Sequence, residues 1–86
     1  ERVSRRERKN FRLMADELTI RKEVANLATS LIEDGYRRDF AVKLPDTYFM
    51  KLHHIKNGSR ITLVGNYKKS CIMQFRNGKL TNTKTI

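Results

Sequence analysis

Residues 20–31, IRKEVANLATSL, decide what the first half of the chain is expected to form. Ile20, Val24, Leu27 and Leu31 recur at spacings of four, three and four residues, which is the period of one face of an α-helix. Further apolar residues widen this stripe, namely Met14, Leu18, Ala25, Ala28 and Ile32. Gly35 follows the stripe, and glycine is the usual residue just past a helix end. The pattern predicts a long helix over residues 5–33.

A short second helix is predicted over residues 36–44. Tyr36, Phe40 and Leu44 are four residues apart and would share one helical face. This helix must end before Pro45, because a residue that precedes proline avoids the α region. The expected fold class is therefore mostly α, in one small domain over residues 1–86 whose helical part is 1–44.

Beyond Pro45 the periodicity weakens, and residues 45–86 are expected to form an extended, irregular, basic part. Residues 61–64 resemble a short strand, and Ser70 would cap a possible short helix over 71–76. Residues 81–86 are polar and expected to be extended. Turns are indicated at Asn57-Gly58, Gly65-Asn66 and Asn77-Gly78. A segment without a core of its own usually becomes ordered by lying on a partner.

The charge of the chain is distributed unevenly. The 86 residues carry 19 Lys and Arg against 9 Asp and Glu, a net charge of +10. Residues 1–12 have a net charge of +4, residues 13–46 of −2, and residues 47–86 of +8 with no acid at all. A solvated surface normally mixes both signs, whereas a field of one sign suits a polyanion. Nucleic acid is the expected partner, because bases here alternate with hydrogen-bonding residues rather than with an apolar helical face that would bind a membrane.

Several classes of protein are excluded or disfavoured. Cys71 is the only cysteine, so a disulfide scaffold is excluded and a zinc site is not expected. No run of about 18 apolar residues is present, so no transmembrane segment is expected. No acid, base and nucleophile stand out together, so we expect no enzyme, no cofactor and no small-molecule substrate. No apolar segment follows the basic start, so no secretory signal is expected, and the first twelve residues do not look like a transit peptide.

The candidate nucleic-acid contacts lie in two groups. On a helix, Arg5, Arg8, Lys9 and Arg12 share one face that can lie along successive phosphates, and Arg6 is beside them. The second group is the basic and polar set of the C-terminal half, namely Lys56, Asn57, Arg60, Asn66, Lys68, Lys69, Ser70, Arg76, Lys79 and Lys84. Tyr67 and Phe75 can each stack on a base or fill space, and packing is the expected role of Phe75.

Four stretches, in this order, carry a resemblance to a known family. They are Arg6-Glu7-Arg8-Lys9 with Glu17-Leu18, then Lys43-Leu44-Pro45, then Ile55-Lys56-Asn57 through Arg60-Ile61-Thr62-Leu63-Val64-Gly65-Asn66, and finally Lys69-Ser70-Cys71-Ile72-Met73. Together they resemble ribosomal small-subunit protein fourteen in its zinc-free bacterial and mitochondrial form. Ile61, Val64 and Asn66 stand where that family has Cys, Thr and Arg, and a Pro-Arg-Gly segment is missing before Tyr67.

The resemblance implies a non-enzymatic protein of helices and long irregular segments. Its members lie in the head of the small ribosomal subunit, among neighbouring ribosomal proteins, and fold the rRNA there. By position, the central contacts would come from Lys56, Asn57, Arg60, Asn66, Lys69 and Ser70. The departures from the family pattern suit a divergent, organelle-encoded version, so a mitochondrial ribosome is the expected location and the cytoplasm the other choice.

Two other functions remain open from the sequence. The helices expected on either side of Gly35 could form a helix-turn-helix regulator of phage or plasmid type that binds DNA. The apolar helix stripe could instead hold the chain to a larger protein assembly, with RNA contact incidental.

Overall fold

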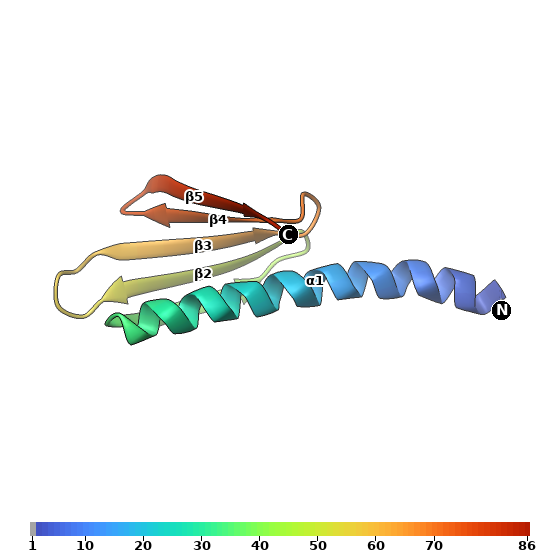
Figure 1. Cartoon of the computed structure of the whole chain (residues 1–86), viewed down its shortest axis with the longest axis horizontal. Coiled ribbons are helices and arrows are strands. Elements are labelled where there is room, and N and C mark those ends of the chain that lie inside the picture. Colours follow the sequence, from blue (N-terminus) through green and yellow to red (C-terminus); the bar gives the residue numbers. More distant parts are fainter. Residues whose placement is uncertain (1) are drawn as a thin grey trace.

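One helix and one antiparallel sheet make up the structure, a computed structural model that describes the backbone of residues 2–86 and the side chains of residues 17–86. The helix is α1 (Arg2–Glu33). The strands are β1 (Tyr36–Lys43), β2 (Thr47–His54), β3 (Arg60–Asn66), β4 (Cys71–Arg76) and β5 (Lys79–Thr85). They pair in sequence order, β1-β2-β3-β4-β5, as an antiparallel meander, and α1 runs along it and continues past its end (Figure 1). The expectation of a mostly α fold is therefore wrong.

The long N-terminal helix is confirmed, and it ends where the sequence indicated. Gly35 has a φ of 108°, and its amide donates to the carbonyl of Ile32 at 3.1 Å, which ends the helix with a left-handed residue. A 32-residue helix is about 48 Å long at ~1.5 Å per residue, whereas an eight-residue strand spans about 26 Å. Only the C-terminal part of α1 can therefore lie on the sheet.

The second helix, expected over residues 36–44, is strand β1 instead. Tyr36 pairs with His54 of β2, and Phe40 pairs with Lys51. The register shifts between Arg38 and Phe40, so that Asp39 forms a bulge and the strand reverses its alternation there. Tyr36 and Phe40 therefore lie on opposite faces of a bulged strand, and their four-residue spacing does not reflect a helical period.

The C-terminal half is also regular, contrary to the expected irregular segment. The strand-like run at 61–64 is confirmed as part of β3, and the turns at Asn57-Gly58 and Asn77-Gly78 are present. The short helix expected over 71–76 is strand β4, because Ser70 has a φ of 48° in the turn before it and caps nothing. Gly65 lies inside β3 and is not a turn. The polar tail pairs with β4 as strand β5.

The core lies between α1 and one face of the sheet. From the helix it takes Ile20, Val24 and Ala28, with Leu27 and Leu31 packed at its margin. The sheet contributes buried side chains from four strands, namely Tyr36, Met50, Leu52, Ile61, Leu63 and Ile72. Burial of each large apolar side chain is worth about 1.5–3 kcal/mol, so this single layer is the main stabilising contact of the domain.

The helix approaches the sheet most closely at Gly65. A β-carbon at this position would lie 2.5 Å from Cγ2 of Ile20 and 3.5 Å from Cγ2 of Val24. Such a distance to Ile20 is shorter than real contacts allow, so the absence of a side chain at Gly65 lets α1 pack directly on the backbone of β3. The helix could not lie where it does over any larger residue.

The His54 side chain connects the C-terminal end of α1 to the sheet through hydrogen bonds. Its Nε2 lies 2.9 Å from the carbonyl oxygen of Asp34, and its Nδ1 accepts from the amides of Lys56 and Asn57 at 3.2 and 3.3 Å. Because Nδ1 accepts, the ring proton is on Nε2 and is donated to Asp34. One imidazole therefore holds both the end of α1 and the β2–β3 turn.

Gly65→Ala is expected to lower the free energy of unfolding by about 1–3 kcal/mol, because the added methyl group overpacks the contact with Ile20. Chemical denaturation of the single variants and the Gly65→Ala/Ile20→Ala pair measures this. In the Ile20→Ala background the same substitution should cost much less, since the clashing methyl group is gone. Equal costs in both backgrounds would show that the close approach is not the cause.

The Tyr67 hydroxyl oxygen is buried and makes no hydrogen bond among the described residues. This burial raises the pKa of Tyr67 above its ordinary value near 10, an effect that the nearby charge of Arg21 opposes and that of Glu17 reinforces. The folded state therefore favours the neutral phenol more than the unfolded state does. Its contribution to stability is complete below pH 10 and declines as the pH rises through the higher pKa of the folded state.

Tyr67→Phe is expected to stabilise the protein by up to about 1 kcal/mol at pH 7, because it removes a buried hydroxyl without a partner. The advantage of the variant should grow between pH 9 and pH 11, because the unsubstituted protein loses the stability that its neutral phenol contributes, whereas the variant has no phenol to ionise. Urea denaturation of both proteins at the two pH values measures it, and all other titrating groups are common to both. A constant difference, or a less stable variant, would contradict the assignment.

Candidate functional site

The face of the sheet opposite α1 is covered by no other element of the described structure, and we call it the open face. Alternation along β2 separates the two faces. Tyr48, Met50 and Leu52 point to the helix layer, where all three belong to or pack on the core. Phe49, Lys51 and His53 alternate with them and lie on the open face.

Strand register places the open-face side chains in rows across all five strands. Directly paired residues of antiparallel strands share a face, so each row can be followed from partner to partner. The first row, from β1 to β5, is Phe40, Lys51, Thr62, Phe75 and Leu80. The second row is Val42, Phe49, Val64, Met73 and Thr83. The open face thus has an apolar centre that contains three phenylalanines.

Much of this apolar surface is in contact with solvent. Phe40 is 49% exposed, Val42 38% and Leu80 55%. Phe49 and Phe75, on the inner strands, are half-buried by their neighbours. An exposed apolar group of this kind marks an interaction site more often than an accident of composition.

Cations accompany the apolar centre. Lys51 lies in the first row between Phe40 and Thr62, and Arg60 lies in the neighbouring row, opposite His53. Both line a hollow of about 220 Å³, whose remaining lining comes from Asp39, Leu52, Ile61, Thr62, Asn77 and Gly78. The amide of Arg60 donates to Oδ1 of Asn77 at 2.9 Å, which fixes the β4–β5 turn as one wall. The hollow offers two cations, a hydroxyl and an amide side chain.

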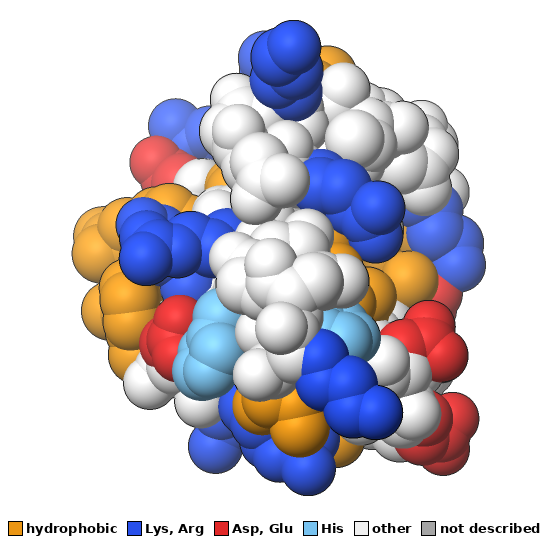
Figure 2. Space-filling model, turned by 90° about the vertical axis from the view of Figure 1, so that its left-hand side faces the viewer, with side chains coloured by type: hydrophobic (Ala, Val, Ile, Leu, Met, Phe, Trp, Pro, Cys, Tyr) orange, Lys and Arg blue, Asp and Glu red, His pale blue; other side chains and the backbone are white. Residues whose placement is uncertain are grey.

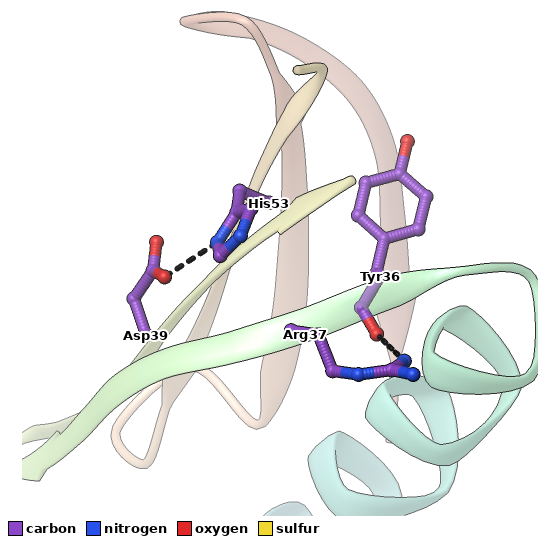
Figure 3. A network of polar contacts seen from close by, with 4 residues as sticks. All are labelled: Tyr36, Arg37, Asp39 and His53. Carbon is purple, nitrogen blue, oxygen red and sulfur yellow. Dashed lines mark hydrogen bonds and ion pairs between the residues drawn. The ribbon is translucent and has the colours of Figure 1, made fainter. Parts of the chain in front are cut away.

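One carboxylate is also present, and a histidine engages it. Oδ1 of Asp39, in the β1 bulge, lies 2.6 Å from Nδ1 of His53 on β2 (Figure 3). Next to it, Arg37 turns back and donates from Nη1 to the carbonyl of Tyr36 at 2.8 Å (Figure 3). Asp39 is the only acidic residue among the five strands, and His53 contacts one of its two carboxylate oxygens.

Positive side chains also gather at the two ends of the sheet. One end has the β2–β3 and β4–β5 turns with Lys56, Arg60, Arg76 and Lys79; the other has the β3–β4 turn with Lys68 and Lys69. Figure 2 views the first of these ends, where Lys and Arg surround the turns and hydrophobic side chains gather along one flank. Two of the cations are paired with acids, Lys68 with Asp46 at 3.6 Å and Lys84 with Glu23 of α1.

The residues that the sequence predicts as nucleic-acid contacts do not all lie in one place in the structure. The cluster Arg5, Arg6, Arg8, Lys9 and Arg12 lies outside the described side chains. Oδ1 of Asn66 accepts from the amide of Lys69 at 2.9 Å within the β3–β4 turn, and the carbonyl of Ser70 accepts from the amide of Ile86 at 2.8 Å, which extends the pairing of β4 with β5. Arg76 donates to the hydroxyl of Tyr36 at 3.3 Å, and Lys84 lies on the helix side. Arg60 is the predicted residue that belongs to the hollow.

The sequence reasoning missed the aromatic part of this face. Phe75, for which packing is the expected role, lies on the open face, whereas Tyr67 packs against the core. Phe40, Phe49 and Lys51 were not named at all as contacts. The signal that could have found them is the two-residue alternation of 47–54, which separates Phe49, Lys51 and His53 from their neighbours.

A second hollow lies between α1 and the first two strands. It has a volume of about 520 Å³ and is lined by Ala25, Ala28, Thr29, Ile32, Arg38, Tyr48 and Met50. Arg38 is its only charged residue, so it offers little to an anion. The open face is therefore the better candidate site.

Two kinds of site are not found in the described part of the chain. Residues 17–86 contain no group of three His, Cys, Asp or Glu side chains that could hold a metal ion. Within the described residues no helix combines the length and the apolar character needed to cross a membrane. Comparisons of the chain with models of protein families, with curated proteins and with solved structures give no match.

Proposed function

We propose that this chain is a non-enzymatic RNA-binding protein that neutralises phosphates with the cations of its sheet. The observation that carries the proposal is that residues 47–86, which form β2 to β5 and their turns, contain eight Lys and Arg and no acid. Six of the eight make no ion pair among the described residues, namely Lys51, Lys56, Arg60, Lys69, Arg76 and Lys79. Such a set of unneutralised cations is what a phosphate backbone requires.

Small-subunit rRNA is the narrower form of this proposal. It is supported by the order of sequence motifs that resemble ribosomal protein fourteen, and it would place the chain among the proteins of the subunit head in an organelle. The family resemblance implies helices and long irregular segments, whereas residues 36–85 form a sheet, so the structure adds no support to it. Sedimentation of a native lysate on sucrose gradients at low and high salt tests whether the chain travels with the small subunit.

The two alternatives from the sequence lose their structural basis. A helix-turn-helix regulator needs a second helix after Gly35, and that segment is strand β1. Attachment to a larger assembly through the apolar stripe of α1 needs that stripe to be accessible, yet its central residues Ile20, Val24 and Ala28 are buried against the sheet, and only its margin, with Leu18 and Ile32, is exposed.

RNA binding should depend steeply on salt. If six cations each neutralise a phosphate, the logarithm of the association constant should fall with the logarithm of the salt concentration at a slope of about −4 on a single strand. Affinity should then drop by about two orders of magnitude between 50 and 200 mM salt. Fluorescence anisotropy with labelled RNA measures this, and absence of binding at 50 mM salt would refute the proposed function.

The double variant Lys51→Gln/Arg60→Gln should bind RNA at least tenfold more weakly and with a slope shallower by about 1.4, because two phosphate contacts are lost. The matched control is Lys22→Gln/Arg38→Gln, which removes the same two charges from exposed positions on α1 and on the helix side of β1. If both double variants lose the same affinity, net charge rather than the open face governs binding.

A further inference from the structure

We propose that the open face binds unpaired nucleotides of a single strand, with bases stacked on Phe40 and Phe75 and a phosphate seated in the hollow between Lys51 and Arg60. This inference rests on the proposed function and adds to it the class of nucleic acid and the residues that distinguish it. It follows from the way in which the sheet combines aromatic rings with cations in a single row.

The first row of the open face combines aromatic rings, which can stack on bases, with a cation and a hydroxyl, which can bind phosphate. Phe40 and Phe75 are three strands apart, about 14 Å at the usual spacing of strands, with Lys51 and Thr62 between them. Phe49 lies diagonally from Phe40, within about 8 Å, and extends the aromatic surface. Bases can therefore lie over the rings while the backbone between them passes over Lys51.

Only unpaired bases can stack on the exposed phenylalanine rings of the open face. In a duplex the faces of the bases are covered by stacking on one another, so a protein ring cannot reach them without unstacking. A single strand offers every base face, and stacking on an aromatic ring is tolerant of sequence. Phe40, which is 49% exposed at the edge strand, is accessible to such a base without any movement of the fold.

The hollow beside the row has the charge that a phosphate requires. Lys51, Arg60, Thr62 and Asn77 offer it donors, and its volume of about 220 Å³ is ample for one phosphate group. Asp39 lines the same hollow, but its carboxylate is engaged by His53 at 2.6 Å. With two cations against this one carboxylate the lining has a net positive charge, and the open face complements a chain that presents apolar bases and anionic phosphates in alternation.

A second copy of the chain is the other occupant to weigh for an apolar sheet face, and the charges of the open face disfavour it. Two open faces packed together would bury Lys51 and Arg60 of both copies, four cations, against two carboxylates, one Asp39 from each copy, which already pairs with His53. Each chain also carries a net charge of +10, so copies repel one another. Charge complementarity therefore selects the polyanion over the dimer.

The test is fluorescence anisotropy with a labelled 12-nucleotide oligouridine and with a 12-base-pair RNA duplex at the same salt concentration. The single strand should bind at least tenfold more tightly than the duplex. Phe40→Leu and Phe75→Leu should each weaken single-strand binding about fivefold or more without changing the salt slope, because they remove a ring and no charge. The matched control is Leu18→Ala, which removes exposed apolar surface from α1 and should leave binding unchanged.

The outcomes separate this inference from the proposed function. Equal binding of single strand and duplex, unaffected by the phenylalanine variants, would overturn the inference and leave RNA binding in place. Binding of neither RNA would overturn both. A concentration-dependent dimer in analytical ultracentrifugation that Phe75→Leu abolishes would assign the open face to a second copy and overturn the inference as well.

Photocrosslinking of the unsubstituted protein tests the same inference without relying on variants that could fail to fold. Oligouridine that contains 4-thiouridine is crosslinked by light to the protein, and the modified peptides are identified by mass spectrometry. Crosslinks in β1 and β4, at or beside Phe40 and Phe75, are the expected result. Crosslinks confined to α1 would contradict stacking on the open face.

Discussion

The packing of α1 against β3 at Gly65 is the contact on which the rest of the molecule depends. Because Gly65 has no side chain, Ile20 and Val24 reach the backbone of the sheet and bury its central residues, such as Ile61 and Leu63. The described residues form one helix, and only its C-terminal part lies along the strands. One face of the sheet is thereby covered, and nothing in the described structure covers the other.

The apolar composition of the open face is not explained by the stability of the fold. Strands with one solvated face usually place polar residues there, whereas here Phe49, Val64 and Met73 form a central apolar row. Their burial contributes little to the fold, because no second layer packs on them. An apolar row beside Lys51 and Arg60 is better explained by a partner that has both apolar surfaces and negative charge, as an unpaired nucleic-acid strand has.

How far the sequence predicts this structure differs from one segment to the next. The stripe of Ile20 and Val24 has one strong period, so the helix was predictable. In β4, the apolar residues Cys71, Met73 and Phe75 face one side, but Ile72 lies on the other side with Gln74 and Arg76, so the first three residues are all apolar and the two-residue alternation is hidden. In β1 the bulge at Asp39 imitates a helical spacing. The basic character of the site was visible from counting charges, but its aromatic row required the register between strands.

Both edges of the sheet have features that oppose edge-to-edge pairing with a second copy of the chain. At one edge, the bulge at Asp39 interrupts the regular hydrogen-bonding line of β1. At the other edge, β5 is polar and carries Lys79 and Lys84, and charged edge strands resist pairing with copies. The positive charge that makes copies repel one another would also attract the proposed RNA partner, which would neutralise it on binding. If the chain binds RNA as proposed, its solubility in the free state and its affinity for RNA have one electrostatic origin, so a substitution that lowers the positive charge of the open face should weaken both together.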